Sequence, residues 1–411
     1  MTMETDKEPV VSPSPLRVPS SRLSSDPSLL PSVSSPLSSV IGIDASRAAR
    51  ARRTGTETYA LELIKALAAL DSSHRLRLYT PHLPQHADWP RAPHIETRVI
   101  PWPRLWTHLR LSAELRLHPP DVLFVPAHVL PFYCPVPAVV TVHDLGYCYY
   151  PEAHRPFDRW YLDWTTRRHC RLARAIIADS AATKQDLVNF YQADPDRIRV
   201  IYLGRDERLA RVSDPQVVAQ TKIRYGLEGD YLLYIGTLQP RKNLVRLVEA
   251  FHLATRNRPG LKLIIAGQRG WLYNDLLARV QQLGLAKRVI FTGYIDDADK
   301  PALLSGALAY VFPSLYEGFG LPVLEAMACG TPVLTSNVSS LPEVAGDAAL
   351  LVDPHDAPAI ADGLTQLITN PDLRRSLVEA AYRQVQKFSW QRAATQVLEV
   401  LERALSIQSE T

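Results

Sequence analysis

The chain alternates between short runs of consecutive apolar residues and segments in which apolar residues recur every three to four positions. Residues 231–235 and 307–312 are apolar with no helical period, which is typical of strands buried on both faces of a sheet. Residues 59–70 instead carry Leu61, Ile64 and Ala68 at helical spacing. Because such segments alternate along most of the chain, the pattern predicts an α/β fold with two doubly wound parallel sheets.

The predicted elements divide into two sets. In the first half we expect strands at 39–44, 76–78, 95–100, 121–126, 138–142, 175–180 and 200–202, and helices at 59–70, 102–117 and 182–191. In the second half we expect strands at 231–235, 261–266, 289–291, 307–312 and 331–335, and helices at 244–255, 273–283, 300–305, from Pro322 to about 329, 357–367, 371–387 and 390–407.

The composition of the N-terminal segment differs from that of the rest. Ser and Pro dominate it, its apolar residues have no period, and it lacks the continuous apolar core of a signal peptide, so we expect a disordered tail. The length of 411 residues allows two further domains of ordinary size. The predicted divisions are a tail at 1–38, an N-terminal domain at 39–205, a C-terminal domain at 206–388 and a final helix at 389–411.

Charge and cysteine usage exclude several classes of protein. The 46 basic and 42 acidic residues give a net charge of +4, too small and too dispersed to predict a nucleic-acid partner. The four cysteines have no metal-ligand spacing and indicate free thiols in a reducing compartment. No apolar run approaches the ~20 residues that span a bilayer. The residues at 102–117 predict an amphipathic helix with Leu105, Leu109 and Leu115 on its apolar face. This face either packs on the core or faces anionic lipid or a lipid-linked acceptor.

The segment 307–335 predicts a strand, a polar turn, a helix and a second strand. The turn, Glu317-Gly-Phe-Gly320, brings bare backbone close to whatever binds there, and Pro322 suits the first turn of the helix. A glycine loop that leads into a helix N-terminus at the carboxyl end of a strand is a typical anion site of α/β proteins. Taken singly, Glu317 is also explained as a solvated loop residue, and Glu325 as a first-turn acid favoured by the helix dipole.

The spacing of these two glutamates carries a resemblance to a known family. Glu317 and Glu325 bracket Gly-Phe-Gly-Leu-Pro, and the similarity continues through 339–346 and 351–354. This resembles the Glu-x7-Glu signature of the family-4 retaining glycosyltransferases, over about residues 40–408. The resemblance implies the GT-B fold, in which two Rossmann-like domains face each other across a cleft and a C-terminal helix crosses back to the first domain.

The resemblance also implies roles for individual residues. The catalytic candidates are His143 beside the transferred sugar, Lys242 and Arg241 at the leaving diphosphate, and Glu317 at the sugar hydroxyls. The donor-binding candidates are Gly55, Gly293, Tyr294, Gly318, Phe319, Gly320, Leu321 and Glu325, the last at the ribose hydroxyls. Where part of the family has an arginine, this chain has Thr237, and Arg241 is expected to supply the second charge. A solvated basic pair at a helix start is the alternative, although the helix dipole disfavours positive charge there.

The implied reaction is the transfer of a hexose from a nucleotide sugar to a hydroxyl acceptor with retained configuration, in polysaccharide or glycolipid synthesis. The segment 236–243 resembles members that use GDP-mannose, and a UDP-hexose is the alternative donor. No metal or other cofactor is expected, because two cations and a helix N-terminus can hold a diphosphate. The expected acceptor is a glycan or a lipid-linked glycan, and the expected location is cytoplasmic, with peripheral contact to the inner face of the membrane. A non-catalytic nucleotide-sugar-binding module is the other class of function considered.

Overall fold

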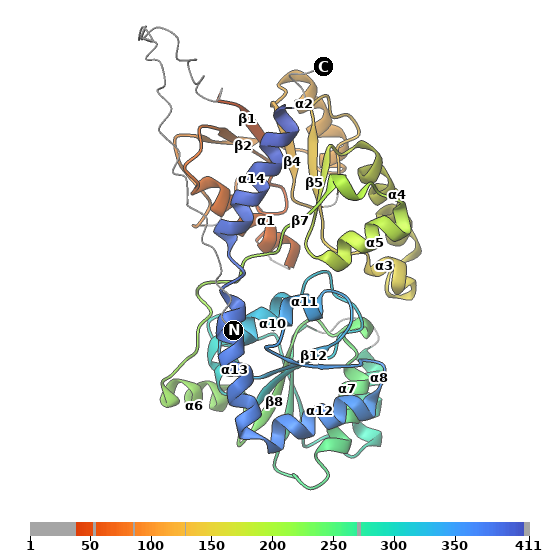
Figure 1. Cartoon of the computed structure of the whole chain (residues 1–411), viewed down its shortest axis with the longest axis vertical. Helices are drawn as coiled ribbons and strands as arrows, with labels where there is room; N and C mark the ends of the chain where they lie inside the picture. The colour runs from red at the N-terminus through yellow and green to blue at the C-terminus, as the bar shows by residue number, and fades with distance from the viewer. Residues whose placement is uncertain (1–37, 52–54, 85–86, 128, 269–272, 407–411) are drawn as a thin grey trace, which may run out of the picture. The chain divides into compact units, whose positions relative to one another are not determined.

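The computed structural model describes residues 38–51, 55–84, 87–127, 129–268 and 273–406 (Figure 1). Apart from residue 38, the predicted tail lies outside these residues. Two parallel sheets with surrounding helices make up the described chain, so the predicted α/β class with two doubly wound domains is confirmed. Among the described residues, no helix combines the length and the apolar character needed to cross a bilayer.

The first sheet has seven strands in the order β3-β2-β1-β4-β5-β6-β7, and every neighbouring pair is parallel. Its strands are β1 (Val40–Asp44), β2 (Arg75–Thr80), β3 (Ile95–Val99), β4 (Val122–Val125), β5 (Ala138–Val142), β6 (Ala175–Ala178) and β7 (Ile198–Val200). The chain winds outward from β1 in one direction and then, from β4, in the other. This reversal places a topological switch point between β1 and β4.

The second sheet repeats this topology with six parallel strands in the order β10-β9-β8-β11-β12-β13. Its strands are β8 (Tyr231–Ile235), β9 (Lys262–Ala266), β10 (Val289–Gly293), β11 (Ala309–Phe312), β12 (Val333–Ser336) and β13 (Leu350–Val352). Here the winding direction reverses between β8 and β11. The carboxyl ends of these two strands therefore border the crevice in which open α/β sheets bind ligands.

Helices cover the faces of both sheets. The helices of the first half are α1 (Gly55–Ala68), α2 (Ser112–Leu117), α3 (Gly146–Tyr149), α4 (Pro156–Leu172) and α5 (Ala181–Tyr191). Those that follow are α6 (Pro215–Arg224), α7 (Leu244–Ala254), α8 (Tyr273–Gln282), α9 (Lys300–Ser305), α10 (Leu321–Ala328), α11 (Leu341–Ala345), α12 (Ala357–Thr369), α13 (Pro371–Val385) and α14 (Trp390–Ser406). The last helix, α14, packs on α1 and against β4, β5 and β6, as the resemblance implied.

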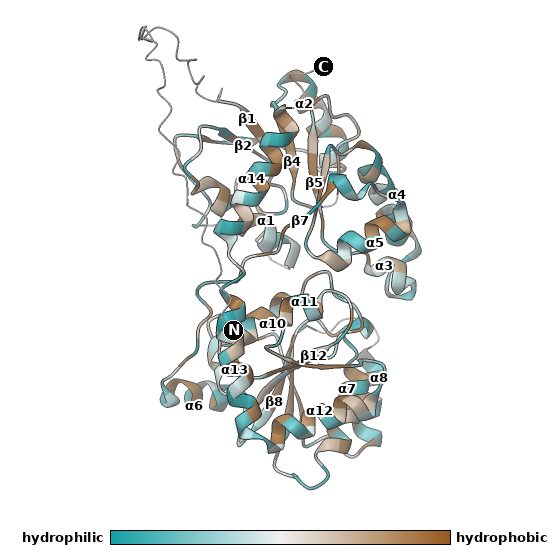
Figure 2. Cartoon of the chain, in the orientation of Figure 1, coloured by the Kyte–Doolittle hydropathy of each residue, from teal (hydrophilic) through white to brown (hydrophobic). Residues whose placement is uncertain are grey.

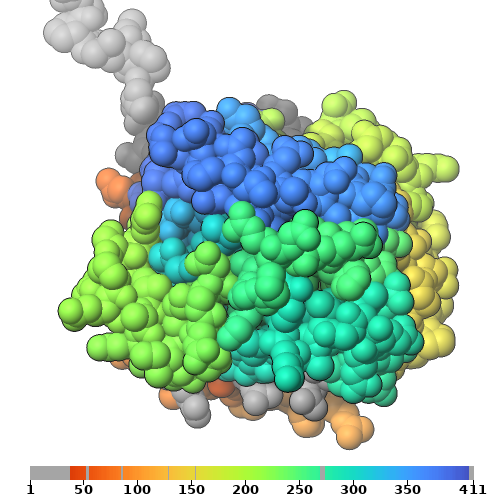
Figure 3. Space-filling view, turned by 90° about the horizontal axis from the view of Figure 1, so that it is seen from below, coloured from red at the N-terminus to blue at the C-terminus, as the bar shows by residue number. Residues whose placement is uncertain are grey.

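Apolar side chains fill the space between sheets and helices. The central strands β4, β5, β11 and β12 are buried along their whole length, which accounts for their largely apolar sequences. Figure 2 shows the labelled strands β4 and β5 in brown tones, whereas helices such as α14 carry both brown and teal residues. Helix α12 packs against α7, and the space-filling view shows the blue surface of late helices beside the green surface of earlier ones (Figure 3).

The predicted helix at 102–117 was wrong in its start and in its buried face. Leu105 has φ 52°, and the chain then forms a π-helix at Trp106–Leu111 before α2 begins. A π-helix has more residues per turn than an α-helix, so the residues that face the core differ from those of a 3.6-residue period. Leu105 and Leu109 are consequently exposed (60% and 46%), whereas Leu115 is buried.

Further elements differ from the sequence prediction, among them β7 and α4. The expected strand at 200–202 lies earlier, at Ile198–Val200, where it pairs with β6 in register with Ile176–Ala178. The prediction rested on the apolar run 200–202. The observed strand instead includes the exposed Arg199, which is tolerated because β7 lies at the edge of the sheet. Helix α4, with 17 residues, was not predicted. Its buried residues are Thr165, Thr166, His169 and Cys170, so no large apolar residue marks its core face.

Candidate functional site

The candidate site lies at the switch point of the second sheet. A loop follows β8 and ends in a 3-10 turn at Pro240–Lys242, and a second loop follows β11 and ends at Gly320, the cap of α10. The amide of Leu315 donates to the carbonyl of Arg241 over 2.8 Å, so the two loops lie side by side. Residues that are some 75 positions apart in sequence thus meet at one edge of the sheet.

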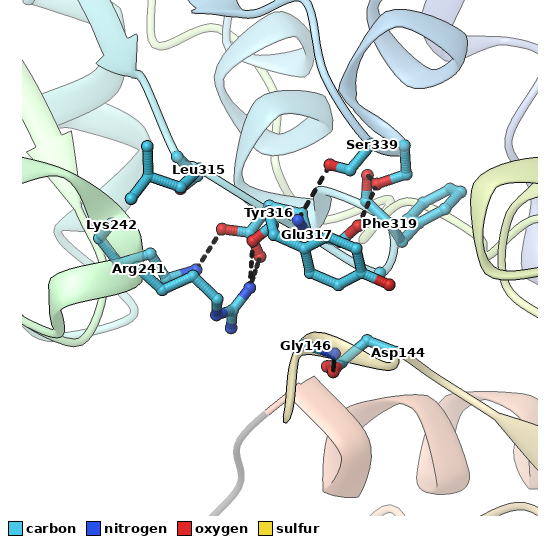
Figure 4. Close-up of polar contacts among 12 residues, drawn as sticks. Asp144, Gly146, Arg241, Lys242, Leu315, Tyr316, Glu317, Phe319 and Ser339 are labelled. Atoms are coloured by element: carbon cyan, nitrogen blue, oxygen red, sulfur yellow. Dashed lines mark hydrogen bonds and ion pairs between the residues drawn. The ribbon is translucent and has the colours of Figure 1, made fainter. Parts of the chain in front are cut away.

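A carboxylate held by two cations forms the centre of this site (Figure 4). The Nζ of Lys242 lies 2.5 Å from Oε1 of Glu317, and Nη1 of Arg241 lies 3.0 Å from Oε2. Arg241 also donates to the carbonyl of Tyr316. The ammonium of Lys242 lies 4.9 Å from the centroid of the Phe312 ring, within cation–π range. All three charged side chains are four-fifths or more buried, which strengthens the electrostatic attraction between them.

Burial and ion pairing shift the pKa values of these three charged groups in opposite directions. Burial alone would raise the pKa of Glu317, but the charges of Arg241 and Lys242 outweigh it and hold that pKa below its usual range. Burial lowers the pKa of Lys242, only partly offset by Glu317. The guanidinium of Arg241 is also buried, yet Glu317 and Asp144 raise its pKa above the usual value. At neutral pH the cluster therefore contains an ionised carboxylate whose charge its own cations satisfy.

Hydroxyl groups hold the Glu317 loop in position. The hydroxyl of Ser340 is fully buried and lies 2.9 Å from the carbonyl of Glu317 and 2.7 Å from that of Phe319. The amide of Glu317 donates to Oγ of Ser339 over 3.0 Å. Gly320 has φ +119°, a conformation that L side chains rarely adopt, and this allows the sharp turn into α10. The sequence motif 339–346 thus acts on the site by fixing the loop that carries Glu317.

Asn243 positions the two cations and was given no role by the sequence. It has φ 60°, a left-handed conformation that asparagine tolerates better than most residues. Its side-chain amide donates to the carbonyls of Pro313 (3.0 Å) and Pro354 (2.7 Å). It therefore joins the end of the β8 loop to the loops that follow β11 and β13. Its place directly after Lys242 was the one signal that could have indicated this role.

Replacing Asn243 by alanine is expected to lower the free energy of unfolding by about 2 kcal/mol. The change leaves the buried carbonyl of Pro313 without this donor and places a Cβ-bearing residue without a polar side chain at positive φ. Chemical denaturation measures the effect. The control is Asn189→Ala on the exposed surface of α5, which should change stability by less than about 0.5 kcal/mol. Equal stability of the two variants would contradict a positioning role for Asn243.

Glu325 lies in a separate ion pair. It is the fifth residue of α10, in the second turn and not the first, so the helix dipole does not explain it. Its Oε2 lies 2.5 Å from Nζ of Lys300 at the start of α9. Both side chains remain about one-fifth exposed and accessible to a ligand. Sequence reasoning missed Lys300, because only the fold brings α9 next to α10.

His143 follows β5 in the first sheet and is held from both sides. Its Nδ1 lies 2.7 Å from Oδ2 of Asp179, and its Nε2 lies 2.9 Å from the carbonyl of Pro126. Since both partners are acceptors, the ring fits best when both nitrogens carry a proton. Burial alone would lower the pKa of His143, but the charge of Asp179 outweighs it, and the pKa lies above its usual range. Tyr59 on α1 contacts the same ring edge to face.

In Asp179→Asn, the pKa of His143 is expected to fall, because the opposite charge is lost while the shape is kept. Histidine ring titration by NMR measures this, with His143→Gln identifying the resonance. Because the pKa of His143 is raised in the folded state, its ion pair with Asp179 stabilises the fold below the unfolded-state pKa, near 6.5. This stabilisation is lost as the pH rises through the folded-state pKa. The stability difference between wild type and variant should therefore shrink above neutral pH. An unchanged titration would exclude Asp179 as the cause.

The loop after β5 contacts the loop after β11. A Cβ added to Gly318 would lie 2.1 Å from the carbonyl oxygen of His143, so only glycine permits this approach. The hydroxyl of Tyr316 accepts from the amide of Leu145 (3.2 Å) and donates to Asp186 (2.6 Å). Figure 4 shows the Asp144–Gly146 turn next to Tyr316 and Arg241. The structure thus brings the backbone at His143 to the Glu317 loop.

Other predicted donor-binding residues lie elsewhere or serve the fold. Gly55 is in the first turn of α1 with open space around it, and no contact within the described residues joins it to Glu317. Gly293 (φ +72°) and the 64% exposed Tyr294 lie at the end of β10, two strands from β8. Phe319 is buried beside the rings of Tyr202 and Phe388. Leu321 is the first residue of α10.

The side chains at the site offer positive charge and hydrogen-bond donors to an anion. Among the residues that the structure describes, no three His, Cys, Asp or Glu side chains are grouped so as to hold a metal ion. Arg241 and Lys242 can exchange their contacts with Glu317 for contacts with phosphate oxygens, which match the geometry of guanidinium and ammonium donors.

Comparison with known proteins places this site in a family. The family model described as "Glycosyltransferase Family 4" matches residues 53–209, and "Glycosyl transferases group 1" matches residues 221–384. The chain is 34% identical over 373 residues to the O-antigen chain mannosyltransferase B of Escherichia coli, covering 84% of this chain and 95% of that protein. The chain belongs to the family-4 glycosyltransferases. The predicted resemblance is therefore confirmed.

Solved structures agree with the GT-B fold of this glycosyltransferase. Sucrose-phosphate synthase from Thermosynechococcus elongatus matches with a TM-score of 0.69 at 23% identity, over 90% of this chain and all of that one. Anabaena HepE in complex with UDP and glucose matches with a TM-score of 0.70 at 21% identity, over 89% of this chain and 99% of that one. At these identities the likeness concerns the fold alone.

Proposed function

We propose that this glycosyltransferase transfers mannose from GDP-mannose to a hydroxyl group of a glycan or lipid-linked glycan, with retention of the anomeric configuration. The observation that carries the proposal is the buried cluster of Arg241, Lys242 and Glu317 at a sheet switch point, where α/β proteins bind nucleotides. The choice of mannose is supported by the relative that is 34% identical and named an O-antigen chain mannosyltransferase. Such a reaction would take place on the cytoplasmic side of a membrane.

In the proposed reaction the acceptor oxygen bonds to the anomeric carbon on the face from which the diphosphate leaves. The bond from that carbon to the diphosphate breaks, its electron pair stays on the diphosphate, and the hydroxyl proton passes to a diphosphate oxygen. Catalysis then depends on stabilising the charge that develops on the leaving group. Arg241 and Lys242 are the side chains placed for this role.

Glu317 would serve two functions in turn. Without donor it neutralises the two cations, which keeps them from being buried without a counter-charge. With donor present the diphosphate takes over part of that charge, and a carboxylate oxygen becomes available to accept from hydroxyls of the sugar. Glu325, still partly exposed beside Lys300, would accept from the ribose hydroxyls. This division differs from the paired catalytic carboxylates of retaining glycosidases, one of which forms a covalent intermediate.

A donor panel tests the proposal. Thermal stabilisation and release of nucleoside diphosphate would be measured with GDP-mannose, UDP-glucose, ADP-glucose and dTDP-glucose, each with and without EDTA. Of the four donors, we expect only GDP-mannose to stabilise the protein against heat and to be turned over. Turnover should persist in EDTA because two protein cations face the leaving group. Turnover of a UDP-sugar instead would support the proposed reaction but with a different sugar donor. Binding of a nucleotide sugar without turnover on any of a panel of glycan acceptors would indicate a nucleotide-sugar-binding module. Binding of none of the nucleotide sugars would refute the site assignment.

A further inference from the structure

A second basic region lies at the opposite edge of the first sheet from His143. A cavity of about 1000 Å³ opens where β5, β6 and β7 begin, and residues near the end of α14 form another of its walls. The strand ends that carry His143 are the carboxyl ends, so this cavity is at the other edge of the same sheet. Its position separates it from the donor site proposed above.

Positive charge is concentrated in the lining of this cavity. Among the described residues that line it, six are cationic, namely Arg171, Arg174, Lys184, Arg197, Arg199 and Arg403, and one is acidic, Asp196. The excess of five positive charges exceeds the net charge of +4 of the whole chain. Most protein surfaces carry charges of both signs. A cavity lined by charges of one sign raises the local concentration of counter-ions.

Among the described residues, most of these cations have no carboxylate partner to neutralise their charge. Lys184 donates to the carbonyls of Pro195 (2.8 Å) and Ile198 (3.0 Å), and Arg197 donates to the carbonyl of Ala173. Within the part of the chain that the structure describes, the guanidinium groups of the other four make no hydrogen bond or ion pair; they are Arg171, Arg174, Arg199 and Arg403. This contrasts with the donor site, where Glu317 satisfies both cations.

We propose that this cavity is a second anion site that binds a phosphate-bearing molecule. A guanidinium presents parallel N–H donors that match two oxygens of a phosphate, and several arginines together favour a ligand with more than one negative charge. The cavity has the volume of a small-molecule site. Leu172 lines it and is 61% exposed, so a free phosphate compound and the headgroup of an anionic lipid are two sources of the same chemistry.

The test counts diphosphate sites by isothermal titration of the full chain with inorganic diphosphate. We expect two sites in the wild type, one lost in Lys242→Ala and the other weakened at least tenfold in the double variant Arg174→Gln/Arg199→Gln. The matched control is Arg256→Gln/Arg383→Gln, which changes two exposed arginines away from both sites. The single variant Arg403→Gln, on α14, serves if the double variant does not fold. Sugar transfer should be unchanged in the double variant, so a failure here is distinguishable from a failure of the proposed function.

Sedimentation with vesicles distinguishes the two sources. Binding to phosphatidylglycerol vesicles and not to phosphatidylcholine vesicles, lost in Arg174→Gln/Arg199→Gln, would identify a lipid headgroup. Diphosphate binding without vesicle binding would identify a free phosphate compound. The proposal is overturned if the double variant matches the wild type in both diphosphate stoichiometry and vesicle binding.

Discussion

Replacing Lys242 by alanine is expected to lower the turnover of the donor by about a hundredfold or more. Removing one preorganised hydrogen-bond donor that stabilises a developing negative charge typically has an effect of this size. Lys242 is buried, lies 2.5 Å from Glu317 and faces the switch point between β8 and β11. The loss should fall mainly on kcat, because the charge on the diphosphate increases as the bond to the sugar breaks.

Steady-state kinetics with the donor and an acceptor measure this effect, with Lys287→Ala as the control. Lys287 is exposed and lies in the turn before β10, so its removal should leave kcat unchanged. A Lys242→Ala variant that raises KM and keeps kcat within a few-fold of wild type would show that Lys242 binds the donor without assisting its departure.

Replacing Glu317 by glutamine is expected to lower the free energy of unfolding by about 3 kcal/mol and to abolish most activity. The variant keeps the shape of the side chain but leaves the charges of Arg241 and Lys242 buried without their carboxylate, which is strongly destabilising. A nucleoside diphosphate should then raise Tm more in the variant than in the wild type, since its phosphates supply the missing negative charge. Equal ligand shifts in the two proteins would contradict this role of Glu317.

The pH dependence of this effect has a defined direction. The pKa of Glu317 in the folded chain is below its usual value, so its contribution to stability is present above about pH 4.3 and is lost as pH falls through the folded-state pKa. The difference in Tm between wild type and Glu317→Gln should therefore shrink below about pH 4. In the control, Glu249→Gln breaks a partly exposed pair with Arg279 and should cost less than about 1 kcal/mol.

Much of the fold follows from local sequence patterns. Strands β8 and β11 are apolar throughout because both of their faces are covered, and such runs are recognisable without tertiary information. Helix α4 was missed for the opposite reason. Its core face consists of threonine, histidine and cysteine, and these residues give no hydrophobic period.

The candidate site divides in the same way. The residues Glu317 and Glu325, the cations Arg241 and Lys242, and the turn at Gly320 are all visible in the sequence, because glycines and charges at strand ends are local features. Their partners are not visible. Lys300 pairs with Glu325 from another helix, and Asp179 pairs with His143 across 36 positions.

The sequence by itself therefore determined the fold class, the family and the identity of the charged groups. Only the tertiary structure decided that Glu317 neutralises both Arg241 and Lys242 and that Asn243 holds them in place. It also decided that four arginines without an ion-pair partner among the described residues gather around a cavity at the far edge of the first sheet. The physical reason is that secondary structure depends on neighbours along the chain, whereas the state of a buried charge depends on which distant groups the fold brings within a few ångströms.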